Sequence, residues 1–315
     1  MTSPQIQYDA ELSDFSYPFP VKHFEIKSQR QTLKMAYMDV SPQASNGKVV
    51  VLLHGKNFGG FYWEPSIRAL TEAGFRVIVP DQIGFGKSSK PQCYQFGFQD
   101  LATNTFSLLE NLNIDRASIV GHSMGGMLAV RFALMHSTFT TELVLVNPLG
   151  LEDWKTTVPY RTIDDFYADE LKATAESVRD YQKVSYYDGN WTPEYESLIQ
   201  AQIGWINHPD YPKVAWNAAL TSEMILTQPV IYEFPLIHVP TLLIIGQRDR
   251  TAIGKTWVSK DIAAPLGNYP VLGKAAAQAI PNAKLVEIQG AGHVPQIEKF
   301  PEYKRALLDF LIHSA

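Results

Sequence analysis

The sequence predicts a doubly wound, mostly parallel α/β sheet with a helical cap inserted between two of its strands. Three observations predict this class. Short apolar runs typical of strands alternate with helical patterns over most of the 315 residues. One long stretch carries only helical patterns, and a serine framed by glycines stands in a tight turn from a strand to a helix.

The strands are predicted where branched apolar residues form short runs that end at Gly, Pro or polar residues. Residues 23–40 predict two antiparallel strands with a polar turn near residues 28–31. Six further runs are suited to strands buried on both faces of a parallel sheet, and they cover residues 49–53, 76–79, 117–120, 143–146, 241–245 and 284–288. Helical patterns between these runs cover residues 66–73, 98–112, 124–136, 273–279 and 301–313.

The stretch from residue 150 to residue 235 differs from the rest of the chain in composition. It holds 14 acidic against 6 basic residues and four of the six tryptophans. Four amphipathic helices are predicted in it, over residues 162–170, 173–185, 193–206 and 213–228. We therefore expect a core formed by residues 1–149 and 236–315 and a helical cap, or lid, at residues 150–235. A separate helical domain with its own role is the alternative.

Composition excludes several classes of protein. Hydrophobic residues make up 45% and charged residues 19%, which is ordinary globular usage, so disorder and fibrous repeats are excluded. The net charge of −5 gives no reason to expect a nucleic-acid partner. No apolar run approaches the ~18 residues that a membrane span requires. The single cysteine, Cys93, excludes an intramolecular disulfide and a cysteine-rich metal or iron–sulfur site.

Residues 1–20 contain three acidic residues and no apolar block like that of a signal peptide. The chain as written is therefore expected in the cytoplasm, with the periplasm or secretion as the alternative if a leader has been removed. Its partner is expected to be a small molecule that carries an acyl group. The sequence leaves the oligomeric state open.

The strongest motif is Gly121-His122-Ser123-Met124-Gly125. It directly follows the strand run 117–120 and leads into the helical pattern 124–136. A turn from strand to helix this tight requires very small residues two positions before and after its centre, and it exposes the central side chain above the carboxyl end of the sheet. Ser123 is therefore the predicted nucleophile.

A serine nucleophile requires a base, and the base requires an acid that orients it. Asp249 and His293 follow the strand runs 241–245 and 284–288, at the edge where open α/β sheets bind their ligands. With Ser123 they give the chain order Ser, Asp, His that suits this kind of turn. Glu152 or Asp153, which lie one strand earlier, are the alternative acids.

Two backbone N–H groups are predicted to stabilise the oxyanion of the reaction. One belongs to Met124 at the start of the new helix, where the helix dipole favours negative charge. The other belongs to Lys56, in the loop that follows residues 49–53. His54 in the same loop is expected to tie loops together and to take no part in the chemistry.

No cofactor and no metal are expected. Asp81 occupies the position where a phosphate loop requires glycine, so this residue is expected to brace a tight turn. No Gly-x-Gly-x-x-Gly opens a helix after the first parallel strand, and no spacing of metal ligands is present in the sequence.

Together these motifs resemble the α/β-hydrolase superfamily over nearly the whole chain. The matching segments are residues 52–55, 81–88, 121–126, 246–249 and 290–293. The resemblance implies the α/β-hydrolase fold and a serine esterase-like member with a nucleophile elbow, an oxyanion hole, a catalytic triad and a cap. Carbon–carbon bond hydrolases of the superfamily usually carry Asn before the serine and Trp after the histidine, where this chain has His122 and Val294.

The interval of 44 residues between Asp249 and His293 is longer than is usual in the superfamily. The excess, around residues 256–273, is expected to form an extra loop beside the active-site edge of the sheet. This loop either shapes the entrance for the substrate or is a surface excursion.

We predict a carboxylic ester hydrolase of the carboxylesterase type that forms an acyl-enzyme. The alternatives are hydrolysis of an amide, as in proline iminopeptidase-like peptidases, of a lactone or of a carbon–carbon bond. A binding protein with a hydrolase fold is a third hypothesis, but such relatives generally lack a triad member and none is missing here. The predicted pocket residues are Asn57, Phe58, Trp63, Trp154 and Trp205.

Overall fold

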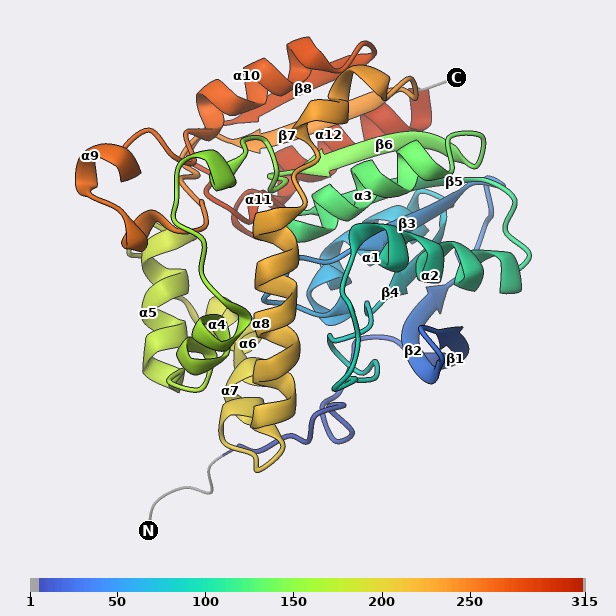
Figure 1. Cartoon of the computed structure of the whole chain (residues 1–315). Helices are drawn as coiled ribbons and strands as arrows, with labels where there is room; N and C mark the ends of the chain where they lie inside the picture. The colour runs from blue at the N-terminus through green and yellow to red at the C-terminus, as the bar shows by residue number, and fades with distance from the viewer. Residues whose placement is uncertain (1–5, 314–315) are drawn as a thin grey trace.

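The computed structural model describes residues 6–313, and a sheet of eight strands runs through the centre of this part of the chain (Figure 1). The strand order is β1-β2-β4-β3-β5-β6-β7-β8. The pairs β1–β2 and β2–β4 are antiparallel, and the other neighbours are parallel. The predicted mostly parallel α/β sheet is confirmed. Residues 1–5, part of the segment considered above for a leader, and residues 314–315 lie outside the described residues.

The predicted strands are all present, and most of them extend past the predicted ends. Their bounds are β1 Val21–Ser28, β2 Gln31–Val40, β3 Val49–Leu53, β4 Arg76–Pro80, β5 Ala117–His122, β6 Thr140–Val146, β7 Thr241–Gly246 and β8 Ala283–Ile288. The extension of β5 has a clear cause, because Gly121 and His122 still pair with Leu145 and Val146 of β6. Pairing with a neighbour lengthens a strand beyond its apolar run.

The central strand β3 shows how the sheet is buried on both faces. Val51 and Leu53 belong to the apolar cluster on one face of the sheet. Val50 and Leu52 belong to the cluster on the opposite face. Because successive side chains of a strand point to opposite faces, a continuous apolar run supplies both clusters at once.

Helices cover both faces of the sheet (Figure 1). Helices α2 (Phe98–Asn111), α3 (Met124–Met135) and α10 (Tyr269–Ala279) contribute to the cluster that contains Val51. Helices α1 (Glu64–Glu72) and α12 (Phe300–His313) contribute to the cluster that contains Val50. The short α11 (Pro295–Glu298) precedes α12.

The strand order reverses direction at β3, which lies between β4 and β5. The chain leaves β3 toward one side of the sheet and leaves β5 toward the other. Loops that diverge in this way open a crevice at the carboxyl ends of the strands, which is where open α/β sheets bind ligands. The loop after β3 and the turn after β5 therefore flank the place where a site is expected.

Residues 150–235 lie between β6 and β7 and contain helices without any strand. We refer to them as the helical insertion. Its helices are α4 (Ile163–Glu170), α5 (Ala175–Ser185), α6 (Pro193–Leu198), α7 (Gln200–Ile206) and α8 (Tyr211–Thr227), with single turns η2 (Trp154–Thr156) and η3 (Ile231–Leu236) at its ends. Figure 1 shows α4, α5, α7 and α8 gathered below the carboxyl edge of the sheet.

The structure corrects the single helix that was predicted over residues 193–206. Two helices, α6 and α7, meet at Ile199. The side chain of Ile199 is fully buried in a small cluster with Val178 of α5 and Ile203 of α7. The local sequence contains no Gly or Pro at this bend. We therefore attribute the bend to the packing of Ile199 against α5.

The segment 256–273, predicted as an extra loop, contains helical turns. A single turn, η4 (Lys255–Trp257), and the short α9 (Lys260–Ala263) precede α10, which begins at Tyr269 and not at residue 273 as predicted. Pro270 lies in the first turn of α10, a position where its missing N–H costs no hydrogen bond. The segment is therefore more ordered than its Pro- and Gly-containing sequence indicated.

Residues 6–17, which we call the N-terminal strap, run from the helical insertion to the sheet. The amide of Tyr8 donates to the carbonyl of Gly204 on α7, at 3.0 Å. At the other end of the strap, the hydroxyl of Tyr17 donates to Asp81 after β4, at 2.6 Å. Along the described residues 6–313, no helix has the length and apolar character needed to cross a membrane.

Candidate active site

Ser123 lies in the turn between β5 and α3, and its backbone has the uncommon dihedral angles φ 57° and ψ −123°. Its amide donates to the carbonyl of Val146 on β6, at 3.2 Å, which fixes the turn against the sheet. The two glycines around it are required by close contacts. A Cβ atom on Gly121 would lie 2.0 Å from the carbonyl oxygen of Gly125, and one on Gly125 would lie 2.2 Å from that of Leu53.

The structure brings Ser123, His293 and Asp249 together in one chain of hydrogen bonds. Nε2 of His293 lies 2.9 Å from Oγ of Ser123. Nδ1 of His293 lies 2.8 Å from Oδ2 of Asp249. All three side chains are buried, and Ser123 is the most exposed of them at 6%. This spacing suits transfer of the serine proton to the imidazole.

The carboxylate of Asp249 is held by more than His293. Its Oδ2 also accepts a hydrogen bond of 2.7 Å from Nδ2 of Asn147, and its Oδ1 accepts one of 2.8 Å from the amide of Thr251. Burial alone would raise the pKa of Asp249, but the facing His293 and these hydrogen bonds together lower it below its ordinary value. Asp249 is therefore held as a carboxylate.

Asn147 is a residue of this site that the sequence reasoning missed. It directly follows β6 and has a positive φ of 36°. Its Oδ1 accepts the amide of Gly246 at the end of β7, at 2.8 Å, so its two side-chain atoms bridge Gly246 and Asp249. Its place at the carboxyl end of a parallel strand is the same signal that identified Asp249, and it would have found Asn147.

His122 is a second missed residue. One of its ring nitrogens, Nε2, lies 2.8 Å from the carbonyl oxygen of His293, and the other, Nδ1, lies 2.9 Å from the hydroxyl of Tyr62. A carbonyl only accepts, so Nε2 carries the hydrogen and Nδ1 accepts from Tyr62. Burial, together with the neighbouring His293, holds the pKa of His122 well below its usual value. The ring is thus neutral and positions the backbone of His293.

The two predicted oxyanion donors belong to the loop after β3 and to the start of α3. Met124 is the first residue of α3, where amides have no partner inside the helix. Lys56 follows β3 and lines the same pocket as Ser123. The loop that carries Lys56 is tied to the helical insertion, since Lys56 forms an ion pair of 3.0 Å with Glu170 and Nδ2 of Asn57 donates to the hydroxyl of Tyr186 at 2.9 Å.

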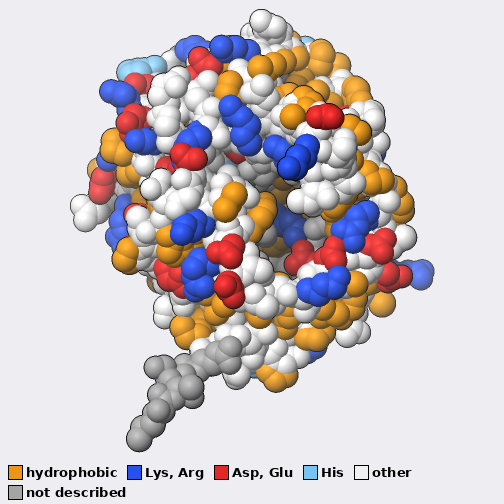
Figure 2. Space-filling model, turned by 90° about the vertical axis from the view of Figure 1, so that its left-hand side faces the viewer, with side chains coloured by type: hydrophobic (Ala, Val, Ile, Leu, Met, Phe, Trp, Pro, Cys, Tyr) orange, Lys and Arg blue, Asp and Glu red, His pale blue; other side chains and the backbone are white. Residues whose placement is uncertain are grey.

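Ser123 and His293 open into a cavity of about 570 Å³ between the sheet edge and the helical insertion. Figure 2 shows a hollow in the face of the molecule that carries the insertion. The apolar part of the lining comes from the loop after β3, the segment after β6, α5 and the residue that follows it, α8 and the segment after β7. The apolar lining residues are Phe58, Leu149, Tyr181, Val184, Tyr186, Ile225, Ala252, Ile253 and Trp257.

The prediction of the pocket residues is corrected in part. Asn57 and Phe58 line the cavity beside Ser123. Trp63 and Trp154 do not, because both are packed in the core of the protein. Trp205 lines a smaller neighbouring cavity that also contains Asn57. The aromatic residues that were missed are Tyr181, Tyr186 and Trp257, which only the placement of the insertion and of segment 256–273 could reveal.

The alternative acids are held elsewhere. Oε1 of Glu152 accepts from the indole of Trp154 and from the amide of Gly267, each at 2.7 Å. Asp153 caps the turn η2 and accepts from the hydroxyl of Tyr232 at 2.8 Å. His293 has its hydrogen bond to Asp249 instead, so the geometry favours Asp249 as the acid.

His54 and Asp81 have the structural contacts expected of them. Nε2 of His54 accepts the amide of Gln82, at 3.0 Å, and so ties the loop after β3 to the loop after β4. Asp81 accepts hydrogen bonds from the amides of Gly60 and Lys87, which braces the turn that follows β4. The single cysteine, Cys93, is exposed.

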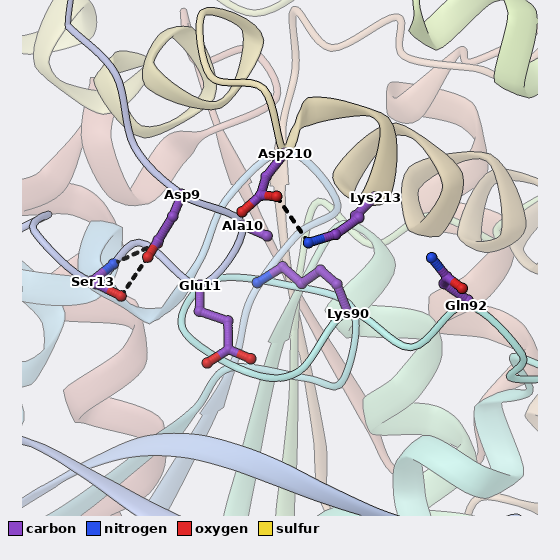
Figure 3. A pocket seen from close by; sticks show the side chains of 8 residues that line it. All are labelled: Asp9, Ala10, Glu11, Ser13, Lys90, Gln92, Asp210 and Lys213. Carbon is purple, nitrogen blue, oxygen red and sulfur yellow. Dashed lines mark hydrogen bonds and ion pairs between the residues drawn. The ribbon is translucent and has the colours of Figure 1, made fainter.

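A second hollow of about 440 Å³ lies away from Ser123, between the N-terminal strap, the loop after β4 and the start of α8. In Figure 3 the amine of Lys90 points toward the space between Glu11 and Asp210. This amine donates to the carbonyl of Ser88 at 2.8 Å, and burial lowers the pKa of Lys90 to about 7. Among the described residues, no group of three or more His, Cys, Asp or Glu side chains is placed to hold a metal ion.

Comparison with known proteins points to one family. The family model described as alpha/beta hydrolase fold matches residues 48–300. A solved structure of a probable hydrolytic enzyme from Pseudomonas aeruginosa PAO1 is 50% identical in sequence and has a TM-score of 0.96. That similarity covers 98% of this chain and 99% of the other.

Named relatives are similar at lower identity. A putative carbamate hydrolase of Pantoea ananatis is 30% identical over 168 residues, which is 53% of this chain and 60% of that protein. The match thus spans less than two thirds of the length of that relative. The 2-hydroxy-6-oxononadienedioate/2-hydroxy-6-oxononatrienedioate hydrolase of Comamonas testosteroni is 27% identical over 276 residues, 86% of this chain and 90% of that protein.

Proposed function

The chain belongs to the α/β-hydrolase fold family and is a hydrolase, and from that premise we propose that it cleaves carboxylic esters through an acyl-enzyme formed on Ser123. One observation carries the proposal. Ser123, His293 and Asp249 form a continuous hydrogen-bonded chain, with the serine opening into a partly apolar cavity. An apolar cavity with a few polar groups at one end suits a small ester.

In the first half of the reaction, Oγ of Ser123 attacks the carbonyl carbon of the ester while Nε2 of His293 takes its proton. The negative charge that develops on the carbonyl oxygen is stabilised by the amides of Met124 and Lys56. Asp249 stabilises the imidazolium and keeps Nδ1 of His293 protonated. The tetrahedral intermediate collapses when His293 gives the proton to the leaving alcohol, and the acyl-enzyme remains.

The second half repeats these roles with water. Nε2 of His293 takes a proton from a water molecule, whose oxygen attacks the acyl carbon. The same two amides stabilise the second oxyanion. Proton return to Oγ of Ser123 releases the carboxylic acid and restores the enzyme.

We further propose that residues 150–235 act as a lid over this cavity and that the remaining chain forms the core. Tyr181, Val184 and Tyr186 of the helical insertion line the cavity that contains Ser123. The ion pair between Lys56 and Glu170 joins the proposed oxyanion loop to α4. The insertion thus supplies much of the surface that would recognise a substrate.

Hydrolysis of a carbamate or of a carbon–carbon bond is the second candidate function. The similarity to the carbamate hydrolase of Pantoea ananatis and to the dienedioate hydrolase of Comamonas testosteroni favours it. The same serine, base and oxyanion donors would serve in either reaction, since each proceeds through attack on a carbonyl carbon. The two candidates therefore differ in the bond that is cleaved and in the pocket around it.

The test is hydrolysis of 4-nitrophenyl esters of increasing acyl-chain length by the wild type and by Ser123→Ala. We expect turnover by the wild type that the variant loses, with a chain-length optimum that reports the depth of the cavity. A fluorophosphonate probe followed by mass spectrometry should label Ser123 stoichiometrically. Labelling without ester turnover would reject ester hydrolysis and favour the second candidate, and turnover that survives in Ser123→Ala would reject Ser123 as the nucleophile.

A further inference from the structure

Four basic side chains line the cavity that contains Ser123. Three of them, Arg248, Arg250 and Lys255, belong to the segment that follows β7. The fourth is Lys56 of the loop after β3. Figure 2 shows Lys and Arg side chains around the hollow on this face of the molecule.

Two of these cations are neutralised within the protein. Lys56 pairs with Glu170 at 3.0 Å. Arg248 donates to Glu298 and lies 3.8 Å from Asp188, which is the one carboxylate among the described residues that line the cavity. Neither Lys56 nor Arg248 therefore carries an uncompensated charge.

Arg250 and Lys255 differ, because within residues 6–313 neither has a carboxylate oxygen within 4.0 Å. The guanidinium of Arg250 donates to the backbone carbonyl of Asp249 at 2.5 Å, and the ammonium of Lys255 donates to the carbonyl of Arg250 at 2.9 Å. A guanidinium has five N–H groups and an ammonium has three, so both retain donors for a ligand. Two positively charged side chains that no carboxylate pairs thus line the cavity.

The surroundings of this pair favour an anion. Burial lowers the pKa of Lys255 and the neighbouring Arg250 adds to that effect, while the carboxylates of Glu152 and Asp249 oppose it without restoring the ordinary value. Thr251, between the two cations in sequence, also lines the cavity. An anion placed here would relieve the repulsion between the two cations and accept charge-assisted hydrogen bonds from them.

We infer that the substrates of this hydrolase carry a carboxylate apart from the scissile ester, and that Arg250 and Lys255 bind it. The inference rests on the ester hydrolysis proposed above and names the class of ester. The apolar part of the substrate lies against Phe58, Tyr181 and Trp257, while the carboxylate meets the two cations. The carboxylate can belong to the acyl part of the ester (the acyl arm) or to the alcohol part (the alcohol arm), and the experiment distinguishes these two cases.

The experiment compares charged and neutral esters that are otherwise matched. For the acyl arm the pair is mono-4-nitrophenyl adipate and 4-nitrophenyl hexanoate. For the alcohol arm the pair is 4-carboxyphenyl hexanoate and 4-carbamoylphenyl hexanoate. The measured quantity is the ratio of kcat/KM for the charged ester to kcat/KM for its neutral partner, after subtraction of the rate with Ser123→Ala.

We expect this ratio to exceed tenfold in one arm for the wild type. Arg250→Gln and Lys255→Gln should each lower it roughly tenfold, with kcat/KM for the neutral ester changed much less, since a hydrogen bond to a charged group is worth about that factor. The matched control is Lys260→Gln, which removes an exposed positive charge on α9 outside the cavity. This control should leave the ratio within a factor of two.

Two failures can be told apart. Turnover of the neutral esters with ratios near one in both arms, or ratios that Arg250→Gln and Lys255→Gln do not change, would overturn the inference and leave ester hydrolysis standing. An equal loss of the ratio in Lys260→Gln would also overturn it, because it would indicate a general charge effect. Absence of turnover of all four esters would overturn the proposed function and this inference with it.

Discussion

Asn147 donates a hydrogen bond of 2.7 Å to Oδ2 of Asp249, the same oxygen that faces Nδ1 of His293 at 2.8 Å. One carboxylate oxygen therefore receives both the imidazole and an amide from a neighbouring strand. The amide limits the directions from which Oδ2 can be approached, and it stabilises the charged form of Asp249. Asn147 is a positioning residue, since it acts on the reaction through Asp249.

Asn147→Ala should lower kcat roughly tenfold, which corresponds to about 1.4 kcal/mol in the activation barrier. The pKa of Asp249 is below its ordinary value in the wild type, and loss of a donor raises it toward that value. A carboxylate with a depressed pKa contributes stability that is lost as pH falls through the folded-state pKa, so the variant should lose stability and activity at a higher pH. The free energy of unfolding and kcat, measured for both proteins across the acid pH range, test this expected shift.

The matched control for Asn147 is Asn282→Ala. The side-chain amide of Asn282 also donates a hydrogen bond, but to the backbone carbonyl of His238 at 2.8 Å, and this residue directly precedes β8 and is exposed. Asn282→Ala should lose stability and activity at the same acid pH as the wild type. An unshifted profile in Asn147→Ala would show that the amide has only a structural role.

Tyr62→Phe should reduce both activity and stability. The hydroxyl of Tyr62 accepts the amide of Gly55 at 3.3 Å and faces Nδ1 of His122 at 2.9 Å, so its loss leaves two buried polar groups without a partner. Such a loss costs about 1–3 kcal/mol in unfolding free energy. Urea denaturation and kcat are measured beside Tyr303→Phe, another buried tyrosine, whose hydroxyl accepts from the hydroxyl of Ser66 at 3.3 Å. Equal loss of kcat in both variants would contradict a role in the site.

Two substitutions of Lys56 distinguish stabilisation of the oxyanion by its backbone amide from stabilisation by its side chain. Lys56→Pro removes the amide hydrogen and should lower kcat by about 10²–10³, the effect of losing one such donor. Lys56→Ala keeps the amide and removes only the ion pair with Glu170, a partly exposed pair worth about 1 kcal/mol or less. Circular dichroism should show that both variants are folded. Similar losses of kcat in the two variants would argue for the side chain.

Two substitutions of Ser123 measure the backbone strain in the turn between β5 and α3. Its φ of 57° and ψ of −123° lie in a region that an L-residue rarely adopts, at a cost of about 1–3 kcal/mol. Ser123→Gly and Ser123→Ala both remove the hydroxyl and should both be inactive, but only glycine relieves the strain. Even after the greater chain entropy of glycine, about 0.5–1 kcal/mol, is subtracted, Ser123→Gly should unfold at a higher urea concentration than Ser123→Ala. The reverse order would indicate an unstrained turn.

Lys90 should make stability depend on pH in the alkaline range. Its pKa is about 7 in the folded protein, against an ordinary value of 10.5. Between these values the unfolded chain binds more protons than the folded protein, so the stability of the wild type rises with pH. The unfolding free energy of Lys90→Met lacks this dependence. From pH 7 to pH 9, the unfolding free energy of the wild type should therefore increase relative to that of Lys90→Met. A constant difference would place the pKa of Lys90 near its ordinary value.

The sheet could be predicted from the sequence because each buried strand is a short, continuous apolar run. Five residues from Val49 to Leu53 are enough to identify β3, since both faces of a parallel sheet are covered. The break between α6 and α7 could not be predicted in this way. It depends on the burial of Ile199 against Val178, which lies 21 positions earlier and has no mark in the local sequence.

The proposed site was predictable to the extent that its residues stand at strand ends. Ser123, Asp249 and His293 each follow a predicted strand, and the carboxyl ends of parallel strands meet at one edge of the sheet. The pocket was less predictable, because Trp63 and Trp257 are alike in sequence terms but one is in the core and the other lines the cavity. Their exposure depends on how the insertion covers the sheet, and a list of aromatic residues does not contain that information.

The N-terminal strap also limits how the helical insertion can move. Besides the bond from Tyr8 to Gly204, the indole of Trp205 donates to the carbonyl of Asp9, at 3.0 Å. The strap therefore anchors α7, at the lower end of the insertion in Figure 1. If the insertion acts as the proposed lid, we expect it to pivot about α7, and the hydrogen bond from Asn57 to Tyr186, which follows α5, to break as it opens. The substrate would then enter beside Tyr181 and Val184, which line the cavity that contains Ser123, and residues 6–17 would fix the position of that entrance.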